Sequence, residues 1–333
     1  MGKTYIVTGG TGFVGNNVVK MLVLGGASVR TLVRSKEKAD IALKGINVEL
    51  FFGDVRDKDA VKKLFDGLKN TEIVFIHTAS VVLIGGNRRE YKNMDDVNYN
   101  GVKNVIETCL AQKARLLYVS SVHAITEPPK RRLTTEIENF DPRSVVGKYA
   151  KSKALATALV MDAVKNKGLD AVIVHPSGIT GPNDYNDSHL TQMVIDYIKK
   201  KIPAAVNGGY DFVDVRDVAS GILKAAEKGK TGDCFLLSNK YYTMMEMFAM
   251  LHEITGGKKI QLKLPMWLAY FSLPFLSAYF TMLGKRPLYT AYSLYTLTSN
   301  SNFSHEKASR ELGYSPRGLR ESLVDTVAFL KEN

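Results

Sequence analysis

The stretch Tyr5-Ile-Val-Thr-Gly-Gly-Thr-Gly-Phe-Val-Gly15 joins an apolar, β-prone pair to a cluster of glycines near the start of the chain. It leads directly into Asn16–Leu22, whose apolar residues recur at helical spacing. This order predicts a strand, a tight turn and a helix. Gly9, Gly12 and Gly15 lie three apart, a spacing that allows a sharp turn, a close approach of a pyrophosphate to the backbone, and close packing of the helix on the strand.

A helix that begins at this turn presents free N–H groups and a partial positive charge to an anion. Glycine-rich turns also occur in plain αβ connections, but this one stands between a predicted strand and a predicted helix. We therefore interpret it as a dinucleotide-binding loop. The loop residues expected to contact the cofactor are Gly9, Thr11, Gly12, Phe13, Val14 and Gly15.

The composition is typical of a globular protein rather than a disordered one. Of 333 residues, 45% are hydrophobic and 23% are charged, which suits a large α/β unit with a smaller lobe. Lys and Arg outnumber Asp and Glu by 45 to 33, so the net charge is +12. Because the basic residues are scattered, we expect a solvated surface that favours an anionic cofactor, and no nucleic-acid partner.

The cysteines and histidines give no sign of a metal or disulfide. Cys109 and Cys234 stand outside any ligand or redox spacing, so we expect buried free thiols in a reducing cytoplasm. The first strand begins by Tyr5, which leaves no room for a signal peptide. His77 has no second histidine or cysteine at ligand spacing, so we expect a packed strand residue and no metal site.

Strands alternate with helices through the first half of the chain. After the opening unit, the expected strands are Ser28–Arg34, Asn47–Val55, Glu72–Ser80, Arg115–Val119 and Ala171–Pro176. Five or six strands in this rhythm predict an α/β fold of the Rossmann type, with a doubly wound parallel sheet and ligands at the carboxyl ends of the strands.

The rhythm changes near Tyr185, which suggests two domains. We assign residues 1–184 to an NAD(P)-binding Rossmann domain and residues 185–333 to a smaller, mainly helical substrate lobe. Residues 205–240 are expected to return partly to the first domain, because Asp211–Ala219 again reads as a strand followed by a helix.

Arg34 ends the second predicted strand, where such a fold places the adenosine ribose. A guanidinium there suits a 2′-phosphate, whereas an acidic residue would accept from a 2′-hydroxyl. Lys36 and Lys38 follow. The basic loop therefore indicates NADP as the cofactor, with NAD as the alternative.

Small and acidic residues end the third and fourth predicted strands. Asp54, followed by Val55, is placed to accept a hydrogen bond from the adenine amino group. Thr78, Ala79 and Ser80 offer the small side chains that a bound cofactor needs for clearance. Plain strand-end turns explain the same residues equally well.

Tyr149 and Lys153 lie four apart on a predicted helix and share one face. A free phenol is a poor proton shuttle at neutral pH, but we expect the Lys153 ammonium to lower the pKa of Tyr149 and make it a general acid or base. Ser121, at a strand end, is placed to hydrogen-bond the substrate oxygen during hydride transfer. Lys153 is also placed to hold the nicotinamide ribose.

Taken together, these motifs resemble the extended short-chain dehydrogenases/reductases. The matching pieces are Gly9-xx-Gly12-xx-Gly15, Asp54-Val55, His77-Thr78-Ala79-Ser80, Val97-Asn98-Tyr99-Asn100-Gly101, Ser120-Ser121, Tyr149-xxx-Lys153 and Pro176. The resemblance implies a catalytic triad of Ser121, Tyr149 and Lys153, with Asn98 assisting through a bound water. It also implies that Pro176 and the residues after it, including Ile179, line the nicotinamide. Ser120 is the neighbouring alternative to Ser121.

Within that family the chain is most similar to the dihydroflavonol-reductase-like and 3-beta-hydroxysteroid-dehydrogenase-like branch. The resemblance rests on Leu32-Val33-Arg34, Asp211–Ala219 and the tail Phe303–Tyr314. It implies an oxidoreductase that interconverts a carbonyl and an alcohol on a hydrophobic molecule of flavonoid or steroid size, and it suggests a homodimer.

Two alternatives remain open at this point. The first is a sugar-nucleotide epimerase or dehydratase, which the branch features disfavour: Val122-His123 replace the acidic pair of a 4,6-dehydratase, and Tyr210 replaces the basic residue usual in epimerases. The second is a cofactor-sensing protein without chemistry, which would have no need of a phenol beside an ammonium.

Residues Leu264–Gly284 form a 21-residue stretch without a charge. Its length equals that of a membrane span, but Pro274 interrupts it and polar residues recur, so a span is disfavoured and a peripheral membrane contact stays open. We expect helices of the substrate lobe, with Trp267, Phe271, Phe275 and Tyr279 around an apolar pocket.

Overall fold

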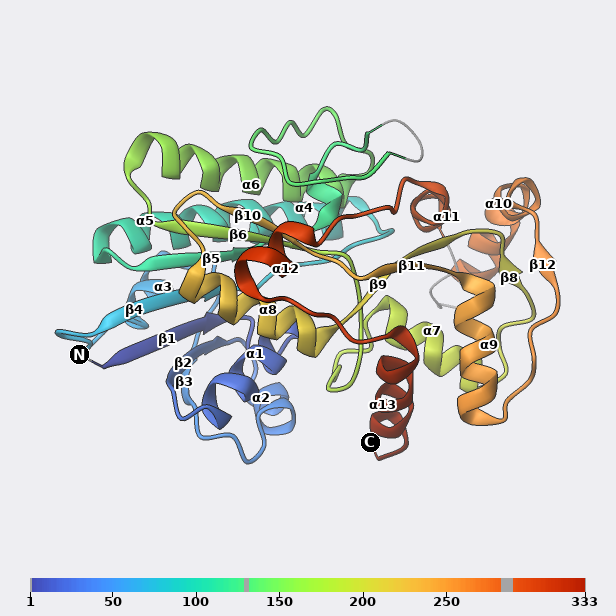
Figure 1. Cartoon of the computed structure of the whole chain (residues 1–333), viewed down its shortest axis with the longest axis horizontal. Helices are drawn as coiled ribbons and strands as arrows, with labels where there is room; N and C mark the ends of the chain where they lie inside the picture. Colours follow the sequence, from blue (N-terminus) through green and yellow to red (C-terminus); the bar gives the residue numbers. More distant parts are fainter. Residues whose placement is uncertain (1, 129–131, 283–289, 333) are drawn as a thin grey trace.

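A computed structural model describes residues 2–128, 132–282 and 290–332 of the chain. Its centre is a seven-stranded sheet in the order β10-β6-β5-β4-β1-β2-β3 (Figure 1). Every strand pair in this sheet is parallel, so the predicted Rossmann-type α/β fold is confirmed. The strands are β1 (Lys3–Thr8), β2 (Ser28–Val33), β3 (Glu49–Phe52), β4 (Glu72–His77), β5 (Arg115–Val119), β6 (Ala171–Pro176) and β10 (Cys234–Leu237).

The strand order reverses next to β1. The chain first builds outward through β2 and β3, and then returns to add β4 on the other side of β1. The connections that leave β1 and β4 therefore part at their carboxyl ends, which opens the crevice where such folds bind dinucleotides. The sequence predicted a longer third strand from Asn47, whereas β3 is a short edge strand with β2 as its partner in the ladder.

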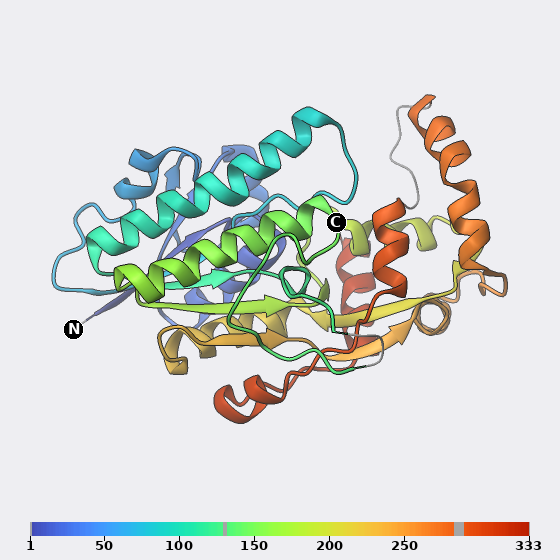
Figure 2. The same ribbon diagram turned by 90° about the horizontal axis from the view of Figure 1, so that it is seen from above.

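Helices cover both faces of the sheet, and each face has its own apolar core (Figures 1 and 2). On one face α1 packs on α8, and α8 packs on α12. On the other face α5 packs between α3 and α6. The helices around the sheet are α1 (Phe13–Leu24), α2 (Lys36–Ala42), α3 (Lys58–Lys63), α4 (Arg88–Asp95), the π-helix η1 (Asp96–Gly101), α5 (Val102–Gln112), the 3₁₀-helix η2 (Val122–Ala124), α6 (Lys148–Lys167), α8 (Val215–Lys228) and α12 (Glu306–Leu312).

A smaller lobe extends from the carboxyl edge of the sheet. It contains a three-stranded sheet in the order β11-β9-β7 and a two-stranded sheet of β12 and β8, with helices around them. Its elements are β7 (Gly178–Thr180), α7 (His189–Ile198), β8 (Ala205–Val206), β9 (Gly209–Asp214), β11 (Lys240–Thr243), α9 (Met244–Thr255), β12 (Lys263–Leu264), α10 (Met266–Met282), α11 (Ala291–Thr298) and α13 (Leu319–Glu332). Strand β9 runs directly into α8 of the main unit, so the lobe and the main sheet share one continuous connection.

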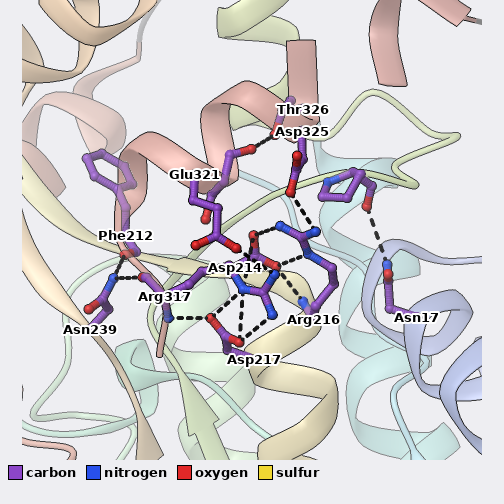
Figure 3. Close-up of polar contacts among 12 residues, drawn as sticks. Asn17, Phe212, Asp214, Arg216, Asp217, Asn239, Arg317, Glu321, Asp325 and Thr326 are labelled. Carbon is purple, nitrogen blue, oxygen red and sulfur yellow. Dashed lines mark hydrogen bonds and ion pairs between the residues drawn. The ribbon is translucent and has the colours of Figure 1, made fainter. Parts of the chain in front are cut away.

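A partly buried ion-pair cluster joins α13 to the junction of β9 and α8 (Figure 3). Asp214 has a fully buried side chain and accepts hydrogen bonds from the backbone and guanidinium of Arg216, and Arg216 also pairs with Asp325 of α13 at 2.6 Å. Arg317 pairs with Asp217 at 3.0 Å. Burial opposes ionisation of Asp214, but the hydrogen bonds from Arg216 outweigh it, so the pKa of Asp214 is lowered.

The uncharged stretch of the sequence forms α10, which packs on α11 at the edge of the lobe (Figure 2). Trp267, Phe271 and Phe275 are 70%, 66% and 67% exposed, so the expectation that they wall an apolar pocket is wrong. The physical reason is that, among the described residues, α10 packs mainly on α11, and these aromatic side chains meet no second apolar surface there. The side chain of Tyr279 lies outside the described part of the structure. Across residues 2–128, 132–282 and 290–332, no helix combines the length and the apolarity that crossing a membrane requires.

Candidate active site

The glycine turn connects β1 to α1 in a conformation that requires glycine. The Gly12 N–H donates to the Gly9 carbonyl at 2.8 Å, which closes the turn. Gly9 has a φ of +80°, and a Cβ on it would lie 2.8 Å from the Ala79 nitrogen. A Cβ on Gly15 would lie 2.5 Å from Thr78 Oγ1 and 2.7 Å from the Gly9 carbonyl carbon. Neither position has room for a side chain, so α1 packs directly against the ends of β1 and β4.

The start of α1 is open to an anion. Gly12 is its N-cap, no side chain caps the helix, and the first turn carries no acidic residue. The free N–H groups and the positive end of the helix dipole are therefore available to an anion at the glycine turn. A dinucleotide pyrophosphate fits this cradle of glycine backbone and uncapped helix. Thr11 lies in the turn, and Phe13 and Val14 begin α1, so these predicted cofactor residues lie in the same loop and helix start.

A loop after β7 lies across this turn, and the sequence did not point to it. Asn186 Nδ2 donates to the Thr11 carbonyl at 2.9 Å, and Lys38 Nζ donates to Asn186 Oδ1 at 3.0 Å. Asn183 Nδ2 donates to Asn17 Oδ1 of α1 at 3.1 Å. Asn186 and Thr11 are 175 residues apart in the sequence, so no local pattern could reveal the contact between them.

The adenosine end of the predicted site is basic. Arg34 follows β2, its side chain is 66% exposed, and its Nη1 lies 3.9 Å from Asp54 Oδ2. Asp54 accepts three hydrogen bonds from Arg56, through the backbone nitrogen, Nε and Nη2, each at 2.9 Å. These bonds lower the pKa of Asp54 and use most of its lone pairs. Arg34 keeps most of its guanidinium open to a ligand, whereas Asp54 has little acceptor capacity left. Val55 is buried.

The end of β4 is tied down by hydrogen bonds. Thr78 Oγ1 donates to the Thr8 carbonyl of β1 at 2.7 Å. Ser80 Oγ donates to Asn98 Oδ1 at 3.1 Å, and Asn98 Nδ2 donates to Ser152 Oγ of α6 at 3.1 Å. Asn98 lies in the π-helix η1 and is almost fully buried. Its amide side chain therefore links the end of β4 to the helix that carries Tyr149.

Ser121 and Tyr149 meet at the carboxyl edge of the sheet. Ser121 follows β5, Tyr149 lies in the first turn of α6, and the Ser121 hydroxyl is near enough to the phenol to act on its pKa. Both are nearly buried. The neighbouring Ser120 instead faces Thr157, with their oxygens 2.6 Å apart, so Ser121 is the serine placed beside the phenol.

The pKa of Tyr149 differs from the sequence-based expectation. Burial raises it to about 12, and the hydrogen bond with Ser121 opposes that rise only in part. The expectation that Lys153 lowers it is therefore wrong for this structure. The reason is the position of Lys153, whose Nζ donates to the Val119 carbonyl at 3.0 Å and lies 5.5 Å from the centre of the Tyr118 ring. Burial lowers the pKa of Lys153 to about 7.

His123 lies next to Tyr149. From the sequence, this histidine served only as an argument against a 4,6-dehydratase. The His123 ring meets the Tyr149 ring edge-on with centroids 5.9 Å apart. Tyr210 of β9 and Tyr292 of α11 each place a hydroxyl 3.2 Å from a ring nitrogen of His123. The position of His123 two residues after Ser121 was a usable signal, but nothing local marked Tyr292, which is 169 residues away.

The remaining predicted residues lie around the same edge. Pro176 ends β6, and Ile179 lies in β7, where it is half-buried. His77 is buried in β4, where its Nδ1 lies 2.7 Å from Thr8 Oγ1, so the expectation of a packed strand residue is confirmed. Within the part of the chain that the structure describes, no three His, Cys, Asp or Glu residues are grouped so that they could hold a metal ion.

Comparison with known proteins assigns the chain to a protein family. Residues 5–237 match the model of the NAD dependent epimerase/dehydratase family. The chain is 30% identical to sterol demethylase protein B of Methylococcus capsulatus, over 99% of this chain and 98% of that protein. It is 28% identical to the mouse (Mus musculus) sterol-4-alpha-carboxylate 3-dehydrogenase, decarboxylating, over 97% of this chain and 89% of that protein. The crystal structure of gox2253 superposes with a TM-score of 0.85 at 30% identity, over 99% of this chain and 98% of that one.

Proposed function

This chain belongs to the NAD dependent epimerase/dehydratase family of extended short-chain dehydrogenases/reductases and is an NAD(P)-dependent oxidoreductase acting on an alcohol or a ketone; we propose that it prefers NADP and acts on a hydrophobic molecule of flavonoid or steroid size. The observation that carries the proposed chemistry is the placement of Ser121, after β5, and of Tyr149, in the first turn of α6, both buried at the sheet edge that also carries the glycine turn. The sterol relatives support the substrate class.

The chain supplies the proton chemistry in this mechanism. Bound NAD(P) provides the hydride donor or acceptor at its nicotinamide. Tyr149, protonated at neutral pH, donates its proton to the substrate oxygen in the reductive direction, and the phenolate takes it back in the oxidative direction. Ser121 hydrogen-bonds the same oxygen while charge develops on it. The free N–H groups at the start of α1 would hold the pyrophosphate, and Lys153, buried beside β5, would hold the nicotinamide ribose.

The decisive experiment is a spectrophotometric screen for NADPH oxidation with ketones and aldehydes of increasing apolar size. A reductase consumes NADPH in proportion to the substrate reduced. A sugar-nucleotide epimerase, the alternative from the same family, would convert its substrate without net consumption of the cofactor. Tight NADPH binding without turnover of any carbonyl would contradict the proposal and favour a cofactor-sensing protein.

Replacing Arg34 with alanine is expected to weaken NADPH binding about 10- to 100-fold, since a charge-assisted contact to a 2′-phosphate contributes about 1.5–3 kcal/mol. NADH, which lacks this phosphate, should lose little affinity. Titration of cofactor fluorescence measures both dissociation constants. Arg310→Ala is the matched control, because Arg310 is as exposed as Arg34 and pairs with Glu311 at 2.8 Å on α12, away from the glycine turn. Equal losses for NADPH and NADH in Arg34→Ala would contradict the NADP preference.

The raised pKa of Tyr149 predicts opposite pH profiles for the two directions. Reduction needs the protonated phenol, so its kcat/KM should stay constant from about pH 8 to about pH 10, above the pKa of Lys153 of about 7 and below the pKa of Tyr149 of about 12. Oxidation needs the phenolate, so its kcat/KM should rise about tenfold per pH unit over the same range. The positive charge of an oxidised nicotinamide lowers the pKa of Tyr149 and sets where that rise ends. A reductive profile that rises with pH would contradict the assigned role.

A further inference from the structure

Three side chains beside Tyr149 form a hydrogen-bonded cluster that the mechanism above does not use. His123 Nε2 lies 3.2 Å from the Tyr210 hydroxyl, and His123 Nδ1 lies 3.2 Å from the Tyr292 hydroxyl. The His123 ring is stacked on Tyr210, with centroids 5.8 Å apart and planes inclined at 18°. The cluster thus joins η2 of the main unit to β9 and α11 of the smaller lobe.

A count of hydrogens shows that this cluster always has one donor to spare. Burial lowers the pKa of His123 to about 4, so the ring is neutral at pH 7 and carries a single N–H. That N–H donates to one phenol, and the other phenol donates to the bare ring nitrogen. Three hydrogens serve two hydrogen bonds, which leaves one phenolic O–H without an acceptor. Within the described residues, neither the Tyr210 hydroxyl nor the Tyr292 hydroxyl has another hydrogen-bond partner.

The spare donor can be on either phenol. If His123 carries its hydrogen on Nε2, the Tyr210 O–H is the free one; if the hydrogen is on Nδ1, the Tyr292 O–H is free. A ligand oxygen that binds one phenol therefore selects the histidine tautomer. The side chain of Tyr210 is buried and that of Tyr292 is half-buried, and a hydroxyl in such a place that lacks an acceptor is costly, so this arrangement is better satisfied when a ligand supplies one.

The cluster is placed next to the reacting centre. Gly147, two residues before Tyr149, packs so closely on the Tyr292 ring that a Cβ there would lie 2.6 Å from its Cδ2 atom. The backbone N–H of His123 donates to Ser121 Oγ at 3.3 Å, so the same short turn holds the serine and the histidine. His123 and Tyr292 remain half-buried, unlike the closed core residues of the sheet.

We propose that the Tyr210–His123–Tyr292 cluster binds a second oxygen atom of the substrate, an acceptor attached close to the carbon that exchanges hydride. This inference rests on the proposed function and narrows its substrate class. Tyr149 and Ser121 hold the oxygen that is reduced or oxidised, and the free phenol of the cluster donates to a carbonyl, hydroxyl or carboxyl oxygen nearby. The enzyme then selects hydrophobic ketones with two neighbouring oxygen functions over simple ketones.

The test compares methyl 3-oxodecanoate with 2-nonanone, which has the same alkyl chain and lacks the ester. In the wild type with NADPH, kcat/KM for the oxo ester should exceed that for the simple ketone. In Tyr210→Phe/Tyr292→Phe, the ratio of the two kcat/KM values should fall about 10- to 100-fold, since a buried hydrogen bond contributes about 1–3 kcal/mol to discrimination. The single variants Tyr210→Phe and Tyr292→Phe should show smaller falls, and they provide the test if the double variant does not fold.

Tyr295→Phe is the matched control, because Tyr295 lies on the same helix, stacks on Tyr292 and donates to Glu127 at 3.3 Å. It should leave the ratio unchanged. An unchanged ratio in the double variant, or an equal fall in Tyr295→Phe, would overturn the inference.

A binding arm separates this inference from the proposed function. Dissociation constants of the two ketones are measured by calorimetry on the NADP⁺-loaded protein, in which no reduction occurs. The expected result is tighter binding of the oxo ester in the wild type and loss of that advantage in the double variant. If the wild type turns over neither ketone yet keeps this difference in affinity, the proposed function fails and the oxygen site stands. If the affinities do not differ, the oxygen site fails.

Discussion

Replacing Tyr149 with phenylalanine is expected to lower kcat for carbonyl reduction by about a thousandfold. Phenylalanine fills the same space on the first turn of α6 and removes only the hydroxyl that gives the substrate oxygen its proton. Since burial keeps the pKa of Tyr149 at about 12, the phenol is a stable proton source at neutral pH, and Ser121 alone offers a hydrogen bond without a comparable route for the proton. Steady-state NADPH oxidation at saturating substrate measures the loss.

The dissociation constant for NADPH should change less than threefold in the same variant, because Tyr149 lies apart from the glycine turn that holds the pyrophosphate. Tyr314→Phe is a suitable control. Tyr314 is a buried tyrosine whose hydroxyl has no hydrogen-bond partner among the residues described, and it packs near α12 in the other core. Its replacement should leave kcat within about twofold. Turnover at the wild-type rate in Tyr149→Phe would contradict the role assigned to the phenol.

The parts of this site that could be predicted from the sequence are those that depend on short spacings. Gly9, Gly12 and Gly15 fix a turn between adjacent elements, and a strand followed by Ser121 must place that serine at the carboxyl edge of a parallel sheet. Tyr149 and Lys153 share one face of one helix because of helical periodicity alone. Each inference needed only local geometry and the parallel topology.

The parts that could not be predicted depend on packing between distant segments. The direction of the Lys153 ammonium is set by the Val119 carbonyl, and a spacing of four residues does not reveal which acceptor a buried lysine finds. Tyr292 reaches His123 from a helix near the end of the chain. The exposure of Trp267 and Phe271 on α10 was missed because the sequence pattern of an apolar helix does not show whether another surface covers that helix.

Replacing Gly15 with alanine is expected to weaken NADPH binding about 100-fold and to lower the free energy of unfolding by about 2–3 kcal/mol. The new Cβ would lie 2.5 Å from Thr78 Oγ1 and 2.7 Å from the Gly9 carbonyl carbon. Gly9 cannot yield easily, because its φ of +80° and the hydrogen bond from the Gly12 N–H to its carbonyl already fix the turn. Helix α1 must therefore move away from β1 and β4, and its free N–H groups are then no longer oriented to bind the pyrophosphate.

Fluorescence titration with NADPH and urea denaturation measure the two effects of Gly15→Ala, and they separate the cofactor loop from a merely structural glycine. Gly318→Ala is the control, because a Cβ there meets no atom within 4 Å. It should change the free energy of unfolding by less than about 0.5 kcal/mol and leave the affinity for NADPH unchanged. Wild-type affinity in Gly15→Ala would mean that the dinucleotide binds elsewhere on the chain. A loss of stability together with unchanged affinity would show that the turn supports the fold but does not hold the phosphates.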